Sequence, residues 1–473
     1  MLFRGITKKY QHLKRYREIV EILLKHGFGY LIDELDLHQF VPLTKRIKSL
    51  DNAPPEASKA KRLRQVLEDL GPTFIKLGQL LSTRPDILPQ DYISELEKLQ
   101  DQAPPISFEL VIEQLEAELE TDYQELFQEF SPEPLASASI GQVHKAILND
   151  GKEVVVKVQR PGIEKKVNAD LDIMTDLARM LEKRVFDELF ISPVEVMDNF
   201  SELIKKELDY RNEARNSVKF KNNFAEKEEV KVADLYWEFI TQKVLVMEYI
   251  EGVSINNLSE IVDRHQIAET IFDSFMQQIL LDGCFHGDPH PGNIMITQNN
   301  RLGLIDFGLI GQISQRDREI AATLFMALLQ KEMGLAVDEL LKLGIVTEEI
   351  DKKALKRDLY ELVDDYYGAT LEQIELGPLV NRLFNLAFEY KIKLPFDFIL
   401  LGKSLVTIEG IITKIDPKFD TAAEAKPFMS KLIKAKLNPK RLLIDLFSGG
   451  RNLFSTLSNL PDEVEYILSL LKN

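Results

Sequence analysis

The sequence predicts an α+β fold with a helical N-terminal region. A β-hairpin pattern covers residues 140–158, where the turn Asn149-Asp150-Gly151 separates two apolar, strand-like runs. Apolar residues recur at helical spacing both before and after this hairpin. The chain has 473 residues, which at about 150 residues per domain is enough for two or three domains. A small β-rich lobe is therefore expected between larger helical regions.

The composition excludes several classes of protein. The formal net charge is −17, from 59 Lys and Arg against 76 Asp and Glu, so a phosphate backbone would be repelled and no nucleic-acid partner is expected. The single cysteine, Cys284, excludes intramolecular disulfide bonds and a thiolate zinc cage, and it fits a reducing compartment. No secretory signal opens the chain and no uncharged apolar run of ~18 residues occurs, so no transmembrane segment is expected.

The N-terminal extension is predicted to be helical. Residues 1–25 carry seven Lys or Arg against two Glu, which is typical either of a solvated first helix or of a helix that docks on a membrane surface or a partner. A break follows at the prolines of positions 54 and 55. Helical spacing then covers residues 60–70, and Pro72 favours the start of a second helix because the first helical position needs no amide donor.

This second helix has an unusual interior. Gly78 lies in its middle, where glycine costs ~1 kcal/mol relative to alanine. Lys76 and Gln79 are three residues apart and therefore project from one face. We expect Gly78 to let another backbone or a ligand come close to the helix.

The remaining elements follow from apolar spacing. Helical spacing covers residues 108–119 and the charged stretch 171–224, and the apolar run 243–249 indicates a strand. Beyond it the chain is predicted to be mostly helical, with short strands at 293–296 and 303–305. No repeat of fixed period occurs, which excludes a solenoid.

A small-residue loop precedes and enters the first strand of the hairpin. Its spacing matches the phosphate-covering pattern G-x-G-x-x-G-x-V, in which glycine lets backbone amides approach phosphate oxygens, but alanines replace the first two glycines. An ordinary small-residue turn is the alternative. The candidate nucleotide-binding residues of this loop are Leu135, Ala136, Ser137, Ala138, Ser139, Ile140, Gly141, Gln142 and Val143.

Lys157 follows this loop by one hairpin, fourteen residues after Val143 and directly after three valines. A lysine in such a strand either extends to solvent or meets an anion. Its place matches the lysine that holds the α- and β-phosphates in kinases. We therefore expect Lys157 to take part in nucleotide binding and catalysis.

The most specific motif is HGDPHPGN at residues 286–293, followed by DFG at residues 306–308. The two segments match the catalytic loop and the metal loop of kinases. Asp288 is expected to accept a hydroxyl proton or to orient the nucleophile. Asn293 and Asp306 are expected to hold Mg²⁺ beside the phosphates of ATP, because magnesium takes oxygen ligands and retains water.

Two histidines of this motif, His286 and His290, are four residues apart and invite a zinc hypothesis. The glycine and proline residues between them disfavour the helix that would bring both rings to one metal ion. His286 is instead expected to orient the loop by hydrogen bonding.

The strand at 244–250 falls where the hinge between the lobes of a kinase would run. Backbone groups of Glu248 and Ile250 are then expected to contact adenine. Packing in the core is the alternative for each of these residues.

With these motifs the chain resembles the UbiB family of atypical, protein-kinase-like proteins over about residues 60–420. The sequence KLGQ at residues 76–79 matches the family's KxGQ motif, and ordinary kinases have neither this motif nor the alanine-rich loop. Glu213 falls where the family's glutamate partner of Lys157 is expected. The family-specific residues that the resemblance implies are Lys76 and Gln79 of KxGQ and Glu207 and Asp209 of an ExD motif.

The resemblance implies a bilobal protein-kinase-like fold in which the KxGQ helix packs over the active site, in space that a protein substrate would occupy. It also implies an atypical kinase or ATPase that hydrolyses ATP with Mg²⁺, is stimulated by membrane lipids and a quinone-precursor-like lipid, and supports isoprenoid (ubiquinone-type) quinone biosynthesis. Enzymes of quinone biosynthesis are the protein partners it implies. The expected location is the cytoplasm, peripherally at the inner face of the cell membrane.

The residues after Gly308 point in the same direction. Helical pattern resumes almost at once, which leaves no long activation segment and no Ala-Pro-Glu motif, so a peptide substrate would lack its usual platform. A small-molecule or lipid phosphotransferase of the aminoglycoside- and choline-kinase type shares these features, but such enzymes have no KxGQ helix. A nucleotide-switched, nonenzymatic lipid carrier or scaffold is the third hypothesis, which the joint retention of Asp288, Asn293 and Asp306 disfavours.

Four segments are expected along the chain: a helical extension over 1–125, a β-rich lobe over 126–250, a lobe with the catalytic and metal loops over 251–425, and basic amphipathic helices over 426–473. Residues 426–451 carry seven Lys or Arg against one Asp, which is typical of peripheral membrane binding or of a solvated helix packed on the core. Many family members extend into hydrophobic C-terminal segments. This sequence ends at Asn473 without one and is expected to be either a soluble variant or a shortened chain.

Overall fold

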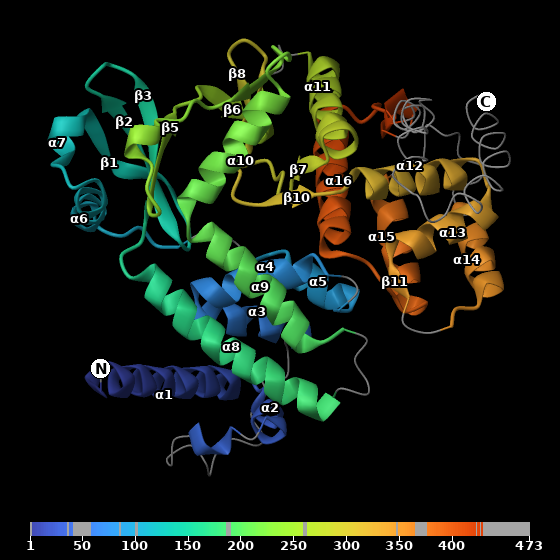
Figure 1. Ribbon diagram of the computed structural model, residues 1–473, viewed down its shortest axis with the longest axis horizontal. Coiled ribbons are helices and arrows are strands. Elements are labelled where there is room, and N and C mark those ends of the chain that lie inside the picture. The colour runs from blue at the N-terminus through green and yellow to red at the C-terminus, as the bar shows by residue number, and fades with distance from the viewer. Residues whose placement is uncertain are drawn as a thin grey trace, which may run out of the picture. The chain divides into compact units, whose positions relative to one another are not determined.

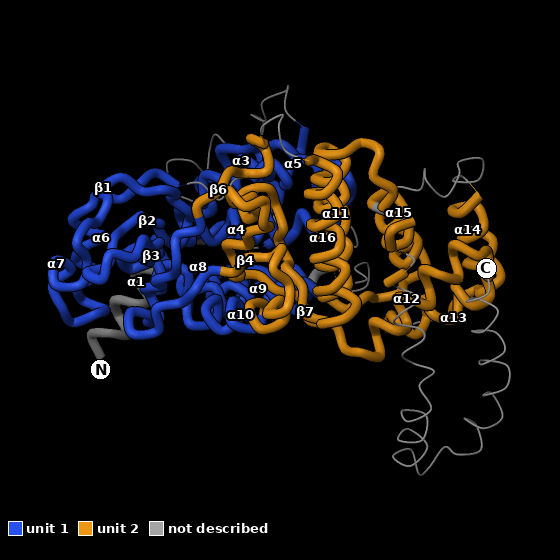
Figure 2. The backbone as a smooth tube through the Cα atoms, turned by 90° about the horizontal axis from the view of Figure 1, so that it is seen from above, with its two compact units in different colours: residues 1–219, 233–250 blue, residues 220–232, 251–473 orange. Residues whose placement is uncertain are grey.

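The fold is taken from a computed structural model of the chain (Figure 1). The structure describes residues 2–35, 37–40, 58–84, 87–99, 103–185, 191–258, 263–346, 349–364, 376–421, 423–425 and 427–428. The predicted basic segment 426–473 thus lies, apart from residues 427 and 428, outside the described residues. Two compact units, coloured in Figure 2, comprise Met1–Lys219 with Ala233–Ile250 and Phe220–Val232 with Glu251–Asn473.

One part of the first unit is helical. They are α1 (Leu2–Lys25), α2 (Gly29–Glu34), the 3-10 turn η1 (His38–Phe40), α3 (Lys59–Leu70), α4 (Pro72–Ser82), α5 (Gln90–Leu96), α8 (Ile163–Val185) and α9 (Pro193–Glu207). Their apolar faces share one core, to which α1 contributes Ile19 and α4 contributes Phe74. The predicted start of α4 is confirmed, since Pro72 takes the first helical position after Gly71 at φ 91°.

An antiparallel sheet forms the other part of this unit, in the order β1-β2-β3-β5 (Figure 1). The elements here are α6 (Phe108–Leu119), α7 (Tyr123–Leu126), β1 (Phe127–Ser137), β2 (Gly141–Leu148), β3 (Glu153–Gln159), the 3-10 turn η2 (Trp237–Phe239) and β5 (Val244–Glu248). Val111 and Leu115 of α6 share a core with the alternating valines of β3. The predicted hairpin is confirmed, and Gly151 of its turn has a φ of 85° that favours glycine.

The strand β1 was not predicted from the sequence. It contains two prolines, Pro132 and Pro134, and its register against β2 shifts between Phe127 and Ala136. Its side chains do not alternate regularly between buried and exposed. β1 stands at the edge of the sheet, where a strand tolerates proline because one row of its amides needs no partner. The small-residue loop is therefore the connection between two paired strands.

The second unit holds the short strands and most of the later helices. Its smaller elements are β4 (Val230–Val232), β6 (Gly252–Ser254), the 3-10 turn η3 (Ile255–Asn257), the π-helical turn η4 (Gln277–Asp282), β7 (Cys284–His286), β8 (Ile294–Thr297), β9 (Leu302–Leu304), β10 (Ile310–Gln312), β11 (Ile345–Val346) and β12 (Ile392–Lys393). One sheet has the order β4-β9-β8-β6, and β7 pairs with β10. The two predicted strands correspond to β8 and β9, whereas the other strands are too short for a clear alternation and were not predicted.

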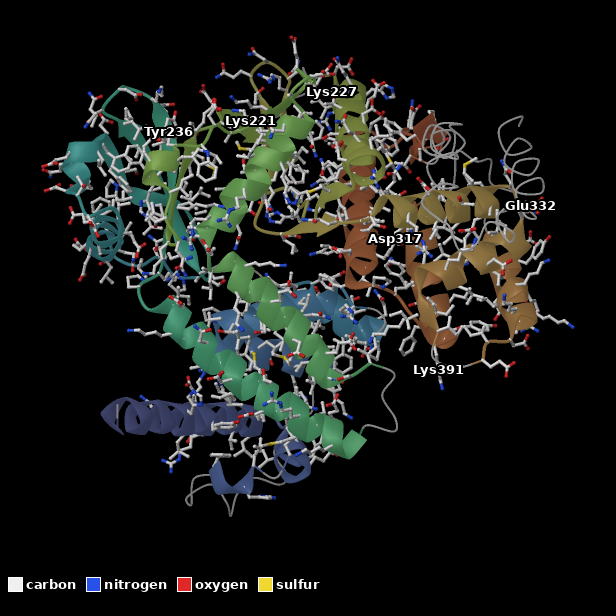
Figure 3. All side chains as sticks on the ribbon, in the orientation of Figure 1. Lys221, Lys227, Tyr236, Asp317, Glu332 and Lys391 are labelled. Carbon is white, nitrogen blue, oxygen red and sulfur yellow. The ribbon has the colours of Figure 1, made fainter. Side chains whose placement is uncertain are left out.

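Long helices pack around these strands on one continuous apolar core. They are α11 (Arg264–Met276), α12 (Gln315–Leu329), α13 (Met333–Leu343), α14 (Lys352–Asp364), α15 (Leu376–Glu389) and α16 (Phe396–Ile415), while α10 (Tyr210–Asn223) runs from the first unit into the second. Ser314 caps α12 by accepting the backbone N–H of Asp317, a residue labelled in Figure 3. Because α12 begins seven residues after Gly308, the prediction that no long segment follows DFG is confirmed.

The helices differ in how much of their surface is apolar. Within the described part of the chain, none of them combines the length and the apolar character that crossing a lipid bilayer requires.

Candidate active site

The alanine-rich loop connects β1 to β2. Ala136 and Ser137 end β1, Gly141 begins β2, and the backbone N–H of Ala138 donates to the carbonyl of Gly141 at 2.9 Å. A Cβ at position 141 would lie 2.3 Å from the Tyr210 hydroxyl oxygen, so this position requires glycine. The loop is thus a short turn between paired strands, with its only glycine packed under a tyrosine.

The remaining loop residues divide by exposure. The side chain of Leu135 is 53% exposed, whereas Ser139, Ile140 and Gln142 are buried. The Gln142 side chain accepts the backbone N–H of Ile106 at 2.5 Å and contacts His144. Gln142 therefore ties the loop to the segment before α6 as well as to its own strand, and Val143 pairs with Lys157 in the β2–β3 register.

Lys157 and Glu213 form an ion pair in the first unit. Lys157 lies on β3, on the face opposite Val156 and Val158, and Glu213 lies on α10. The Lys157 Nζ and Glu213 Oε1 atoms are 2.5 Å apart, and the two side chains are 13% and 9% exposed. A buried pair of this kind keeps the lysine at a fixed place on the sheet, as an anion-binding lysine requires.

The residues of the KxGQ and ExD motifs come together only in part. Lys76 of α4 pairs with Glu207 at the end of α9, with 2.6 Å between Nζ and Oε1. The Gln79 amide instead donates to the carbonyl of Leu99 at 3.2 Å. Asp209 pairs with Arg211, whose hydrogen bonds lower the pKa of this carboxyl.

The expectation for Gly78 was wrong. A Cβ at this position would lie 2.3 Å from the Leu99 Cδ1 atom and 2.8 Å from the Leu67 Cδ1 atom. Gly78 is buried. Leucine side chains occupy the space that we expected to admit another backbone or a ligand. The glycine serves close packing between α3, α4 and the end of α5.

The expected hinge residues end the first unit. The backbone N–H of Glu248 donates to the carbonyl of Asp234 at 2.8 Å, and its carboxylate accepts the backbone N–H of Asp234 at 3.0 Å. Ile250 and Met247 are buried. The Glu248 amide is therefore engaged within the unit, and contact of these residues with adenine stays a prediction.

The loop predicted to be catalytic, residues 286–293, begins at the end of β7 in the second unit and is held by its own hydrogen bonds. The fully buried His286 accepts the backbone N–H of Asp288 at its Nδ1 atom, at 3.1 Å, which is the loop-orienting role predicted for it. Burial lowers the pKa of His286, so the ring is neutral at pH 7. The Asn293 side chain donates to the carbonyl of Asp288 at 3.0 Å and so closes the loop.

Asp306 follows β9 and begins the DFG segment. Its Oδ1 atom accepts the backbone N–H of Gly308 at 2.9 Å, and the Phe307 ring packs on Phe220 with 4.7 Å between ring centroids. Since the Asn293 amide nitrogen is used as a donor, its oxygen remains to act as an acceptor. One amide oxygen and one carboxylate suit Mg²⁺, which completes its shell with phosphate oxygens and water.

Asp288 is paired with a lysine from a distant helix. The Lys403 Nζ atom, on α16, lies 3.0 Å from the Asp288 Oδ1 atom, and the side chains are 32% and 36% exposed. Burial raises the pKa of Asp288, but the charges of Lys403 and His290 and the hydrogen bond from Lys403 outweigh this effect, and the pKa lies below its ordinary value. Asp288 is therefore a carboxylate at neutral pH, as a proton acceptor must be.

Two family models match successive parts of the chain. A family model described as "ABC1 atypical kinase-like domain" matches residues 98–339, and one described as "UbiB helical domain" matches residues 359–420. A protein of Pseudomonas fluorescens named probable protein kinase UbiB is 33% identical over 442 residues, covering 91% of this chain and 83% of that protein. This chain belongs to the UbiB family of atypical kinase-like proteins.

Two further relatives agree with this assignment. An uncharacterized protein encoded in the 5′ region of hydrogenase 1 of Clostridium pasteurianum is 34% identical over 419 residues, with 88% of this chain and 76% of that protein covered. Among solved structures, the complex of Rv3197 from Mycobacterium tuberculosis with erythromycin has a TM-score of 0.52 and 27% identity, over 76% of this chain and 92% of that one. The α+β, kinase-like fold predicted from the sequence is confirmed.

Three residues of this UbiB-family site were missed by the sequence reasoning. Lys403 and its neighbour Ser404 lie in the UbiB helical domain, and the Ser404 hydroxyl donates to the carbonyl of His286 at 3.0 Å. Arg160 donates from Nε to the carbonyl of Ala138 at 2.9 Å. Lys403 is 115 residues from Asp288 in sequence, and no local motif marks such a pair. Arg160 stands three residues after Lys157, which was the one available hint.

Proposed function

We propose that this protein is a Mg²⁺-dependent ATPase that acts with membrane lipids and supports isoprenoid-quinone biosynthesis. The observation that carries the proposal is the catalytic loop, in which an ionised Asp288 stands on a hydrogen-bonded turn closed by Asn293. The Lys157–Glu213 pair in the first unit supplies the lysine that a nucleotide needs. The names of the UbiB relatives support the link to quinone biosynthesis.

The proposed reaction transfers the terminal phosphoryl group of ATP to water. The water oxygen forms a bond to the γ-phosphorus, its proton passes to the Asp288 carboxylate, and the bond to the β,γ-bridging oxygen breaks to release ADP. Lys157 would bind the α- and β-phosphates under the alanine-rich loop. Asn293 and Asp306 would hold Mg²⁺, which neutralises charge on the phosphate oxygens when bound.

Two observations favour water or a lipid over a protein as acceptor. Only the residues 309–314 separate the DFG segment from α12, so no platform for a peptide follows it. The Lys76–Glu207 pair holds the KxGQ helix on α9, and the family resemblance implies that this helix takes the place of a protein substrate. A peripheral site on the inner face of the cell membrane is part of the same proposal.

Phosphate release by the purified chain tests the proposal, with and without anionic liposomes and a phenolic quinone-precursor mimic. We expect stimulation by both additions, dependence on Mg²⁺, and loss of turnover without loss of Mg·ATP binding in Asp288→Asn. Asp306→Asn is expected to lose Mg²⁺-dependent nucleotide binding. Stimulation by a soluble alcohol or amine instead would favour the small-molecule phosphotransferase, and nucleotide binding without any turnover would favour the scaffold.

A further inference from the structure

One face of α16 lies directly on the catalytic loop. Besides the Lys403–Asp288 pair, the Ser404 hydroxyl donates to the carbonyl of His286, and a Cβ on Gly287 would lie 2.8 Å from the Leu400 Cδ2 atom. Residues 400, 403 and 404 share one side of a helix because they are three and four positions apart. Three consecutive residues of the loop, 286 to 288, are thus each contacted by the same helical face.

A second contact fixes α16 beside the loop. The Asp397 carboxylate, one turn before Leu400, accepts the backbone N–H of Gln312 at 3.0 Å, and Gln312 belongs to the strand β10 that pairs with β7. The Ser404 side chain is fully buried. The contacts of Asp397 and Ser404, which lie before and after Lys403 on α16, therefore fix the position of this helix relative to Asp288.

The catalytic loop has no strong cation of its own. The segments HGDPHPGN and DFG contain neither Lys nor Arg. The His290 Nε2 atom lies 3.9 Å from the Asp288 Oδ2 atom, beyond hydrogen-bond distance, and is cationic only when protonated. Lys403 makes the charge-assisted hydrogen bond that the loop's own residues do not make.

We propose that Lys403 is a positioning residue for Asp288, supplied to the catalytic loop by the UbiB helical domain. This inference rests on the proposed function and names one more residue for the same reaction. The ammonium group holds the carboxylate in one orientation toward the nucleophile. It also places a positive charge beside the carboxylate that accepts the proton of the nucleophile.

The expected effect follows from the nature of phosphoryl transfer. Catalysis of this reaction consists mainly of positioning and of electrostatic stabilisation, so a fixed charge at the proton acceptor acts on turnover more than on binding. Loss of a hydrogen bond between charged groups corresponds to about a 10- to 100-fold change in rate. Lys157 and the alanine-rich loop, which would bind the nucleotide in the proposed function, are left unchanged.

Steady-state phosphate release by the full chain tests the inference in the variants Lys403→Met and Lys403→Arg. We expect Lys403→Met to lower kcat about 10- to 100-fold with the KM for Mg·ATP unchanged, and Lys403→Arg to recover most of the loss. Lys414→Met is the matched control, because Lys414 lies on the same helix and contacts the exposed Asn256 side chain. An unchanged kcat in Lys403→Met overturns the proposal. A fall in kcat and in unfolding temperature together with a rise in KM, without recovery by arginine, would show a structural role and also overturn it.

A readout independent of turnover separates this inference from the proposed function. The unfolding temperature is measured for Lys403→Met, Asp288→Asn and the double variant. We expect the double variant to lose less than the sum of the two single losses, because each single change leaves the partner charge uncompensated. Additive losses would contradict the pair itself. If the losses are non-additive but the wild-type chain releases no phosphate, the Lys403–Asp288 interaction is supported and the proposed ATPase function is contradicted.

Discussion

The guanidinium group of Arg160 stabilises the alanine-rich loop by hydrogen bonds. Its Nε atom donates to the carbonyl of Ala138, and its Nη2 atom donates to the Ser137 hydroxyl and to the carbonyl of Pro104, both at 2.8 Å. The backbone N–H of Arg160 also donates to the carbonyl of Ile140 at 2.8 Å. The planar fork of arginine makes these bonds together, which a single ammonium group cannot do. A loop poor in glycine is thus held in one conformation.

Replacing Arg160 with methionine is predicted to weaken nucleotide binding about 3- to 10-fold, because the loop must then be ordered by the nucleotide itself at a cost of about 1 kcal/mol. Titration with a fluorescent ADP analogue in the presence of Mg²⁺ measures the change. Arg179→Met, at an exposed position of α8, is the control. A nucleotide affinity equal to that of the control would show that the conformation of the loop does not depend on the hydrogen bonds of Arg160.

At this scale the sequence was informative where a motif names a residue. Asp288, Asn293, Asp306 and Lys157 stand at the spacing of a known loop or strand, so each could be assigned a role before any contact was known. Arg160 and Lys403 could not be assigned, since their roles come from hydrogen bonds to residues 22 and 115 positions away. Their charges alone do not distinguish them from the other Lys and Arg of the chain.

The KxGQ helix shows how packing overrides helix propensity. Alanine in place of Gly78 would gain up to about 1 kcal/mol in propensity, but the new Cβ would overlap the buried Leu99 and Leu67 side chains, and overpacking costs about 1–3 kcal/mol. We predict that Gly78→Ala lowers the free energy of unfolding by about 1 kcal/mol, measured by urea denaturation.

The matched control is Gly410→Ala in α16, where a Cβ would meet no atom within 4 Å. Propensity alone then acts, and this variant is expected to be more stable by up to about 1 kcal/mol. If both variants are stabilised, the packing around Gly78 is looser than the structure shows.

A buried ion pair joins α1 to the elements around the KxGQ helix. The Arg15 side chain pairs with Asp170 of α8, whose side chain is 1% exposed, and it also donates to the carbonyl of Leu70 at the end of α3. The Thr73 hydroxyl of α4 donates to the same carboxylate at 2.8 Å. The helices α1, α4 and α8 therefore meet at one carboxylate, and Arg15 also binds the end of α3.

Replacing Arg15 with methionine is predicted to lower the free energy of unfolding by about 3 kcal/mol, because it leaves the Asp170 charge buried without its main partner. Chemical denaturation measures this loss. Arg17→Met, two residues along the same helix and exposed, is expected to change stability by less than about 0.5 kcal/mol. Equal effects of the two changes would mean that the net charge of α1, rather than the buried pair, is what matters.

The formal net charge of the whole molecule is −17. High pH adds further negative charge by ionising tyrosines, so stability at high pH tests how strongly burial opposes that ionisation. Burial, together with the nearby Asp176, raises the pKa of Tyr16 to about 12, whereas an unfolded tyrosine titrates near 10. The raised pKa means that the folded chain resists ionisation. Its contribution to stability is complete below about pH 10 and is lost as the pH rises toward about 12.

Tyr16→Phe is therefore predicted to reduce the loss of stability between pH 9 and pH 11, while Tyr360→Phe, at a side chain that is 42% exposed, leaves it unchanged. The full effect of Tyr16 is limited to about 2–3 kcal/mol, since each unit of pKa shift corresponds to about 1.4 kcal/mol. Urea midpoints at the two pH values measure it. The same pH dependence in both variants would contradict the assignment to Tyr16.

The sequence by itself determined the local elements and the chemistry that short motifs encode. Apolar spacing located α3, α4, α6, the β2–β3 hairpin and β5, and three motifs in order predicted which residues bind a nucleotide and a metal ion. These features depend on neighbours within a few residues, and such neighbours are visible in the sequence.

Only the tertiary structure decided which distant residues complete the loops. It placed β1 at a sheet edge despite two prolines, filled the space at Gly78 with leucines, paired Lys76 with Glu207, and brought Lys403 of α16 to Asp288. The physical reason is that a side-chain contact across 100 residues depends on how whole helices pack against each other, and helix packing is fixed by the summed fit of many apolar side chains. No single residue in the sequence carries that information.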